Sequence, residues 1–213
     1  YFACVAAVVL TAGLAPAPVA ARLGGRPAEE WVKTLDSPTR IAGLKVDETV
    51  ERLKLQPGEV VADIGAGSGI FEGSLAKAVA PGGKVFAVDI DQGLLDAIEK
   101  RTQEFKLTNV QTVLGKFTDP SLPTHEIDLA FINDTLHHIE NRAEYLKNLA
   151  GYMKPSGRIA VIDYIPGKGG HPDQPELQVS EEQAAAWMAA VGMKPVEEID
   201  LFDTKWFVVY AKR

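Results

Sequence analysis

Three glycines that alternate with other residues follow an apolar run, and an acid precedes the first of them by two positions. The run covers residues 60–64, the glycines are Gly65, Gly67 and Gly69, and the acid is Asp63. An apolar run followed by glycines predicts a buried strand that ends in a tight turn before a helix. Because glycine has no Cβ, a ligand can approach this backbone closely, with the carboxylate of Asp63 beside it.

The spacing separates this turn from two phosphate-binding turns. A dinucleotide-binding turn has a small residue at the last position of G-x-G-x-x-G/A, where this chain has Ile70. A P-loop has Lys followed by Ser or Thr, and Ile70-Phe71 offers neither. S-adenosylmethionine (SAM) has no phosphate; it offers an ammonium, a carboxylate, a sulfonium and a ribose. We therefore predict that the turn binds SAM through Asp63, Gly65, Ala66, Gly67 and Gly69.

The next two predicted strands also end in residues that could contact this ligand, because open α/β sheets bind ligands at the carboxyl ends of their strands. Asp89 stands about 20 residues after the last glycine, where a carboxylate can accept both ribose hydroxyls. The alternative role, a helix N-cap, suits Asp91 better. Ile90 is then expected along the adenine. Lys116 and Phe117 follow the third strand, and Phe117 either stacks on the adenine or belongs to the core.

The fourth predicted strand ends in the residues most suited to catalysis. Asn133 and Asp134 are expected near the methionine part and the methyl group. His137 and His138 titrate near neutral pH, so one of them could deprotonate an acceptor hydroxyl or amine as a general base. The alternative for each histidine is packing and capping of the following helix. We predict catalytic roles for Asp134, His137 and His138.

The same edge of the sheet also offers residues that could bind a metal ion. Asp134, His138, Asp163 and His171 could converge on a magnesium ion. Because no tight spacing motif links them, the sequence predicts no metal.

Strands that alternate with helices position these residues. We expect strands at 60–64, 84–88, 110–114, 127–132 and 158–162, and two closing antiparallel strands at 196–199 and 206–211. Helices are expected at 26–36, 46–55, 71–79, from 91, at 141–153 and at 181–191, with Lys154–Gly157 ending the fifth. Ser180 and Gln183 form a capping box for the last helix. The pattern predicts an α/β fold with a mostly parallel sheet covered on both faces and an antiparallel edge.

Composition narrows the class of protein. The 213 residues allow one sizeable core, and 46% hydrophobic with 24% charged residues is ordinary for a soluble globular domain. A net charge of −7 without basic runs argues against general nucleic-acid binding. The single cysteine, Cys4, excludes a disulfide framework within one chain and a cysteine-based zinc site.

Residues 1–21 differ from the rest because they have no charge and are rich in alanine. They resemble a secretory signal peptide without its basic start, and they are too short and too proline-interrupted for a membrane span. A flexible arm is the alternative. We therefore expect export to the periplasm or beyond, with the cytoplasm, where SAM is made, as the alternative. The predicted division is 1–21 (signal-like or flexible arm), 22–57 (helical flank) and 58–213 (catalytic domain).

Residues 46–213 resemble the class I SAM-dependent methyltransferases, in particular the type 11/25 group. The resemblance rests on the segments 60–69, 85–89, 128–134 with Leu136-His137-His138, and 149–163. The Leu-His-His element is similar to that of quinone-biosynthesis and other small-molecule methyltransferases. The chain lacks the several cysteines of arsenite methyltransferases and the N/D-P-P-Y/F element of adenine-N6 enzymes. The resemblance implies a doubly wound, Rossmann-like, seven-stranded sheet with Asp63, Gly65, Gly67, Asp89 and the end of the fourth strand around SAM.

The predicted activity is methyl transfer from SAM to a small-molecule acceptor by in-line displacement, with S-adenosylhomocysteine as product. Two rivals stay open: a SAM- or nucleoside-binding protein without catalysis, and an NAD-dependent oxidoreductase, which Ile70 disfavours. The sequence predicts no nucleic-acid partner and specifies neither the acceptor nor the oligomeric state.

Overall fold

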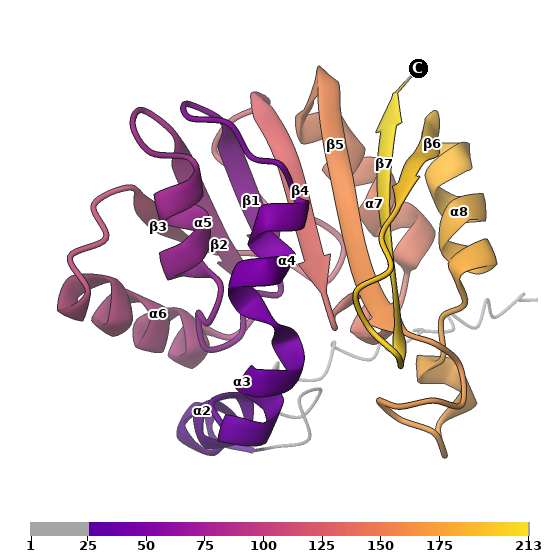
Figure 1. Ribbon diagram of the computed structural model, residues 1–213, viewed down its shortest axis with the longest axis horizontal. Helices are drawn as coiled ribbons and strands as arrows, with labels where there is room; N and C mark the ends of the chain where they lie inside the picture. The colour runs from indigo at the N-terminus through magenta and orange to yellow at the C-terminus, as the bar shows by residue number, and fades with distance from the viewer. Residues whose placement is uncertain (1–25, 213) are drawn as a thin grey trace, which may run out of the picture.

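The computed structural model describes residues 26–212, which form a seven-stranded sheet with helices on both faces (Figure 1). The signal-like segment 1–21 lies outside the described residues. The sheet has the order β3-β2-β1-β4-β5-β7-β6, and only β7 runs antiparallel to its neighbours. The strands are β1 (Val60–Ile64), β2 (Lys84–Asp89), β3 (Val110–Leu114), β4 (Ile127–Asn133), β5 (Met153–Tyr164), β6 (Met193–Glu198) and β7 (Lys205–Lys212). This topology confirms the predicted fold class.

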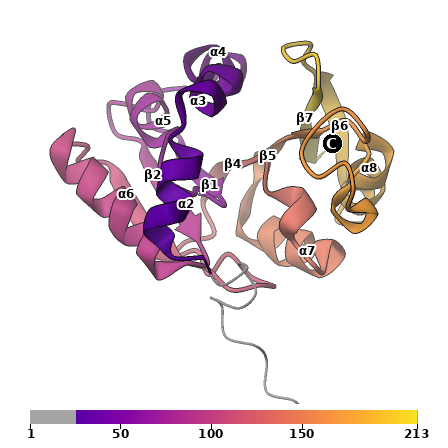
Figure 2. The ribbon, with the colours of Figure 1, turned by 90° about the horizontal axis from the view of Figure 1, so that it is seen from below.

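The central strands are mostly apolar because helices cover the sheet on both sides. Figure 2 shows α4, α5 and α6 on one side and α7 and α8 on the other. One large apolar cluster joins the sheet to Leu53 and Leu75, a second joins it to Leu149 and Met188, and a small third one joins it to Leu95 and Ile98 of α6. The helices that follow β1 are α5 (Glu72–Ala78), α6 (Gln92–Glu104), α7 (Arg142–Tyr152) and α8 (Glu181–Ala190), with short 3-10 turns η1 (Leu136–His138) and η2 (Pro175–Leu177).

Two predicted helix starts are confirmed by their caps. The side chain of Asp91 accepts hydrogen bonds from the backbone N–H of Gly93 at 2.7 Å and of Leu94 at 3.2 Å, and it starts α6. Ser180 and Gln183 form both halves of the capping box at α8. Each side chain satisfies backbone N–H groups that the first helical turn leaves without partners.

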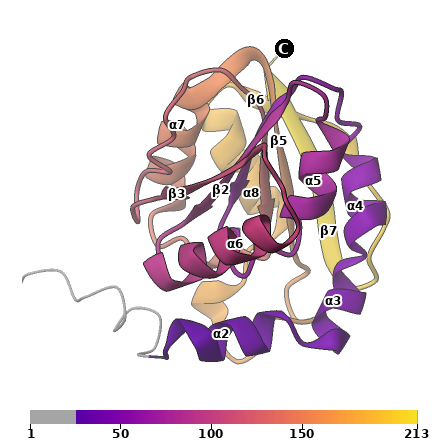
Figure 3. The same ribbon diagram turned by 90° about the vertical axis from the view of Figure 1, so that its left-hand side faces the viewer.

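Within residues 26–212, three helices precede the sheet, where the sequence predicted two. They are α2 (Ala28–Leu35), α3 (Pro38–Leu44) and α4 (Val46–Arg52). Ser37-Pro38 ends α2 as predicted, but Pro38 also occupies the first turn of α3, where its missing N–H costs nothing. Asp36, after α2, pairs with Arg101 of α6 at 2.5 Å. Figure 3 shows α2 lying beneath α6.

The fifth strand starts earlier than predicted. The predicted helix stop at 154–157 lies within β5, where the pairing with β4 shifts register between Ile127 and Leu129. A bulge therefore replaces the expected turn. Gly157 fits there because a Cβ would lie 2.9 Å from the carbonyl oxygen of Ile127. The other strands agree with prediction to within about three residues.

The parallel strands end at the edge of the sheet where α2 and α3 lie. In Figure 1 the arrows of β4 and β5 point toward this edge, and the arrow of β7 points away from it. No helix within residues 26–212 is long and apolar enough to cross a membrane. The carboxyl edge is therefore where the predicted site residues should meet.

Candidate functional site

A cavity of about 620 Å³ opens at the carboxyl edge of the sheet. Its volume is within the range of small-molecule sites. Most of the predicted residues line it: Asp63, Gly65, Ala66, Gly67, Asp89, Ile90, Lys116, Phe117, Asn133, Asp134 and His138. Gly69 and His137 are not among its lining residues. The N-terminal helices and the loop after β5 contribute residues that the sequence did not single out, including Arg26, Trp31, Leu35, Arg40 and Gln174.

The glycine turn holds its shape through backbone angles that favour glycine. Gly65 has a φ of 74° and Gly67 a φ of 60°, both in the left-handed region. A Cβ on Gly65 would lie 2.3 Å from Cγ2 of Thr135, so the turn touches the segment that follows β4. A Cβ on Gly69 would instead lie 3.0 Å from Ile98, so this glycine packs against α6. Gly65 thus sets the distance between two walls of the cavity.

Asp89 connects the end of β2 to the glycine turn. Its Oδ2 accepts a hydrogen bond from the N–H of Gly67 at 2.9 Å, and its Oδ1 accepts one from the N–H of Asp91 at 3.1 Å. Burial raises the pKa of this carboxyl, and the backbone hydrogen bonds oppose that rise. Asp89 also lines the cavity, and its role in ribose binding stays a prediction.

Two buried acids lie behind the turn. Asp63 is 3% exposed and Glu72, in the first turn of α5, is 1% exposed. Burial raises the pKa of Asp63 well above its usual value, and the charge of Glu72 raises it further. Burial also raises the pKa of Glu72 to about 7. One carboxyl of the pair therefore holds a proton near neutral pH. Glu72 was missed because an acid in a first helical turn is ordinary.

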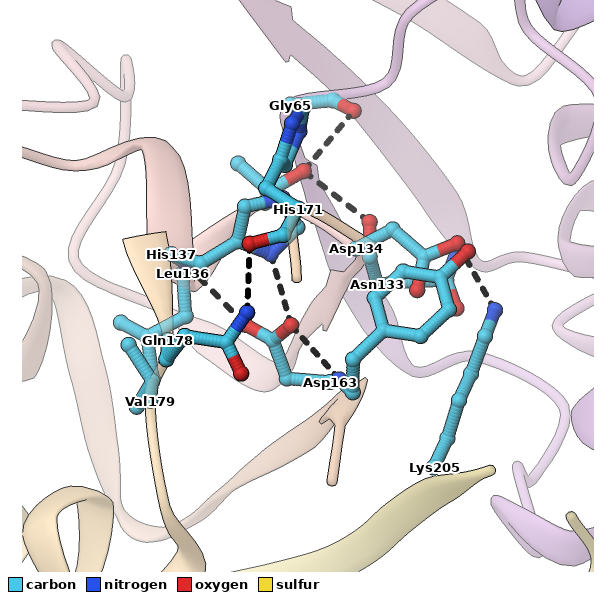
Figure 4. Close-up of polar contacts among 12 residues, drawn as sticks. Gly65, Asn133, Asp134, Leu136, His137, Asp163, His171, Gln178, Val179 and Lys205 are labelled. Atoms are coloured by element: carbon cyan, nitrogen blue, oxygen red, sulfur yellow. Dashed lines mark hydrogen bonds and ion pairs between the residues drawn. The ribbon is translucent and has the colours of Figure 1, made fainter. Parts of the chain in front are cut away.

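Asp134 is held by an ion pair that the sequence did not reveal. It has a φ of 51°, and its Oδ2 accepts a hydrogen bond from Lys205 Nζ at 2.8 Å (Figure 4). The two side chains are only 8% and 7% exposed. Within the described residues, Oδ1 of Asp134 and Oδ1 of Asn133 are buried without a hydrogen-bond partner. Both residues line the cavity, and a buried acceptor without a partner is a candidate for contact with a bound ligand such as the ammonium of SAM.

The two adjacent histidines have different surroundings. His137 is 3% exposed, and its Nδ1 lies 2.6 Å from Oδ1 of Asp163 (Figure 4). His138 is exposed along the cavity. Partial desolvation of its ring, together with the nearby His137 and His171, lowers the pKa of His138 to about 4. The structure therefore puts His138 at the cavity and His137 behind it. Of the four residues weighed as a magnesium site, Asp134 is paired with Lys205 instead.

Comparisons with known proteins agree with the fold. Residues 62–161 match a family model described as a methyltransferase domain. The structure resembles a SAM-dependent methyltransferase from Aquifex aeolicus with a TM-score of 0.77 and 23% identity, covering 87% of this chain and 98% of the other.

Two relatives in sequence are longer than this chain. A demethylmenaquinone methyltransferase from Geobacillus sp. (strain WCH70) is 26% identical over 117 residues, which cover 55% of this chain and 50% of that protein. An uncharacterized 37.1 kDa protein in transposon TN4556 of Streptomyces fradiae is 31% identical over 138 residues, covering 62% and 37%. The chain thus spans half or less of the length of these two relatives.

Proposed function

We propose that this chain is a class I SAM-dependent methyltransferase that transfers a methyl group from SAM to a small-molecule acceptor, and the match of residues 62–161 to a methyltransferase domain supports this. The observation that supports this most is one cavity that gathers the glycine turn, Asp89 and the unpartnered oxygens of Asn133 and Asp134. SAM supplies a methyl carbon made electrophilic by the positive sulfur to which it is bonded. The protein's task is then to hold two molecules in line and to exclude water.

Different residues around the turn are assigned to different parts of SAM. We assign the ribose hydroxyls to the carboxylate of Asp89, because it lies at the end of β2 and lines the cavity. The ammonium is assigned to the free oxygens of Asn133 and Asp134, which lack any other donor within the described residues. Asp63 adds a nearby carboxyl, and Trp31 of α2 encloses the cavity.

The acceptor is assigned to the part of the cavity beside His138 and His171. An imidazole there can accept a hydrogen bond from the nucleophilic group of the acceptor and orient it. His137 lies behind this wall, so we infer a positioning role for it. Asp134 would act beside them through its charge, held in place by Lys205. The name of the Geobacillus relative supports a small-molecule acceptor such as a quinol.

The test of cofactor binding is the variant Asp89→Ala. It should weaken SAM binding at least about tenfold by calorimetry, because a charge-assisted hydrogen bond is worth about 1.5–3 kcal/mol. Asp91→Ala is the matched control. It removes a neighbouring acid that caps α6 but does not line the cavity, so it should lower stability while SAM affinity stays the same. Equal SAM affinity in the wild type and in Asp89→Ala would contradict the assignment.

The test of catalysis uses SAM with a panel of quinols, phenols, amines and thiols and measures S-adenosylhomocysteine. Turnover with one acceptor class is expected, and His138→Ala should lower kcat while SAM affinity is retained. Tight SAM binding without product from any acceptor would favour the non-catalytic binding protein. Binding of NAD in place of SAM would favour the oxidoreductase.

A further inference from the structure

Three of the four histidines in the chain gather at one place beside the cavity. His137 and His138 come from η1, and His171 comes from the loop between β5 and η2. One ligand nitrogen from each ring lies within 4.8 Å of the others. The ring centroids are 4.1 Å apart for His137 and His138, 5.4 Å for His137 and His171, and 5.2 Å for His138 and His171. We propose that these three imidazoles bind a divalent transition-metal ion of the zinc type.

The geometry is close to what such an ion requires. At Zn–N distances of about 2.0–2.1 Å, tetrahedral ligand nitrogens lie roughly 3.3 Å apart. The three rings therefore need to close by no more than about 1.5 Å. Three protein nitrogens leave a fourth position, as in catalytic zinc sites. His138 and His171 both line the cavity, so this fourth position faces the space assigned to the acceptor.

A buried carboxylate fixes the ring of His137. Asp163 is 1% exposed and accepts hydrogen bonds from the backbone N–H of His137 at 3.0 Å and of Tyr164 at 2.8 Å. Its Oδ1 lies 2.6 Å from Nδ1 of His137, so this nitrogen donates and Nε2 keeps the lone pair. A carboxylate behind a ligating histidine is the usual outer partner of protein metal sites.

The loop that presents His171 is held in place by its own contacts. The backbone oxygen of His171 accepts a hydrogen bond from Nε2 of Gln178 at 2.5 Å, and Oε1 of Gln178 accepts one from the N–H of Gly167 at 2.8 Å. Gly169 and Gly170 pack so closely on the ring of Tyr164 that a Cβ would lie 2.7 Å and 2.8 Å from it. The position of His171 is therefore determined by packing against β5.

One arginine ties the two histidine-bearing segments together. Arg142 donates hydrogen bonds to the backbone oxygens of Leu136 at 3.1 Å and His137 at 2.7 Å, and to that of Glu176 at 2.9 Å. The first two oxygens belong to η1 and the third to η2, which follows His171. A site that needs ligands from two segments thus has a dedicated connection between them.

The three-histidine site differs from the magnesium site that the sequence offers as an alternative. Its ligands are nitrogens, which suit zinc, cobalt or nickel better than magnesium. Asp163 becomes the outer partner, and Asp134 has no part because Lys205 holds it. With the ion present, His138 serves as a ligand, and the ion contacts the acceptor in its place. This role in the reaction rests on the proposed function, whereas the binding of the ion does not.

The experiment uses the full chain without a histidine tag, in a Cys4→Ser background, after treatment with chelator. We expect cobalt(II) to bind one ion per chain with the visible spectrum of a tetrahedral site, and zinc to displace it. His171→Ala should weaken binding by at least about tenfold. His125→Ala is the matched control. It removes the remaining histidine, which stacks on Tyr152 away from the site, and should change nothing.

A ligand exchange tests the site even if an alanine variant folds poorly. His171→Cys should keep cobalt bound and add a thiolate-to-cobalt charge-transfer band, which a purely structural role for His171 would not produce. Absence of that band, no cobalt binding by the wild type, or binding that His171→Ala leaves intact would overturn the proposal. SAM titrations of the same variants should show unchanged affinity. Metal binding without SAM binding would refute the proposed function alone, and SAM binding without metal binding would refute the metal site alone.

Discussion

The two halves of the cavity are built in different ways. The half around β1 and β2 consists mainly of backbone and short acids, and its polar contacts join Asp89 to Gly67 and to Asp91. The half around β4, β5 and β7 consists of long side chains from separate segments, as in the pairs Lys205–Asp134 and His137–Asp163. The first half can be recognised in one stretch of sequence. The second appears only when the chain is folded.

The two halves of the cavity also stabilise their buried ionisable groups differently. Behind the glycine turn, the two acids Asp63 and Glu72 stay buried because one of them holds a proton near neutral pH. Across the cavity, Asp134 is buried in an ion pair with Lys205. Buried charge is thus stabilised by protonation on one side and by an opposite charge on the other. This difference predicts distinct responses to substitution and to pH.

The largest effect is expected on the ion-paired half. Lys205→Met leaves Asp134 buried without its close partner, which should cost about 4 kcal/mol of unfolding free energy in urea denaturation. Lys54→Met is the control, because Lys54 and Glu197 form an ion pair whose side chains are 60% and 38% exposed. That change should cost less than about 1 kcal/mol. Adding Asp134→Asn to Lys205→Met should restore part of the loss; similar losses in both single variants would refute the contrast.

A smaller effect is expected at the glycine turn. Gly65→Ala combines a left-handed φ with a contact against Thr135 and should cost about 3 kcal/mol. Gly58→Ala has the same backbone penalty, with a φ of 91°, but meets nothing within 4 Å. It should cost about 1 kcal/mol. If the two variants unfolded at the same urea concentration, close contact with Thr135 would not explain the glycine.

The smallest effect depends on pH. Glu72 has a pKa of about 7 in the folded chain against 4.5 for an ordinary glutamate, so folding increases its proton affinity. Its contribution to stability is complete below about pH 4.5 and is lost as the pH rises through about 7. Glu72→Gln should therefore be on the order of 2 kcal/mol more stable than the wild type well above pH 7, and little different in acid.

Thermal unfolding of Glu72→Gln across this pH range is the measurement. The control is Glu104→Gln, an exposed acid on α6, which changes the net charge equally. A stability difference that does not grow with pH, or one that Glu104→Gln reproduces, would count against a proton held behind the turn.

Much of the fold was predictable because local signals and tertiary packing agree. The predicted limits of β1 and β3 match the structure, and the caps at Asp91 and Ser180 start the helices they were predicted to start. Two features were not predictable. Pro38 can both end a helix and begin one, and the bulge in β5 depends on how β4 packs beside it. Both depend on the neighbouring structure, which periodicity does not describe.

The candidate site divides in the same way. The residues of the glycine turn and Asp89 could be placed because one short segment contains a strand, a turn and the start of a helix. Lys205 and Arg40 could not be placed, because each reaches Asp134 from a distant part of the chain. Glu72 was hidden for another reason: its type is common at its helical position, and only burial makes it unusual.

The reversed direction of β7 has a practical consequence. Its first residue, Lys205, lies at the cavity, so its last residue, Lys212, lies at the opposite edge of the sheet (Figure 1). A linker attached after Lys212 would therefore leave the molecule on the side remote from the ligand. A chain anchored to a sensor chip through that linker should leave its cavity open to solution. SAM and acceptors could then be injected over it without obstruction by the support.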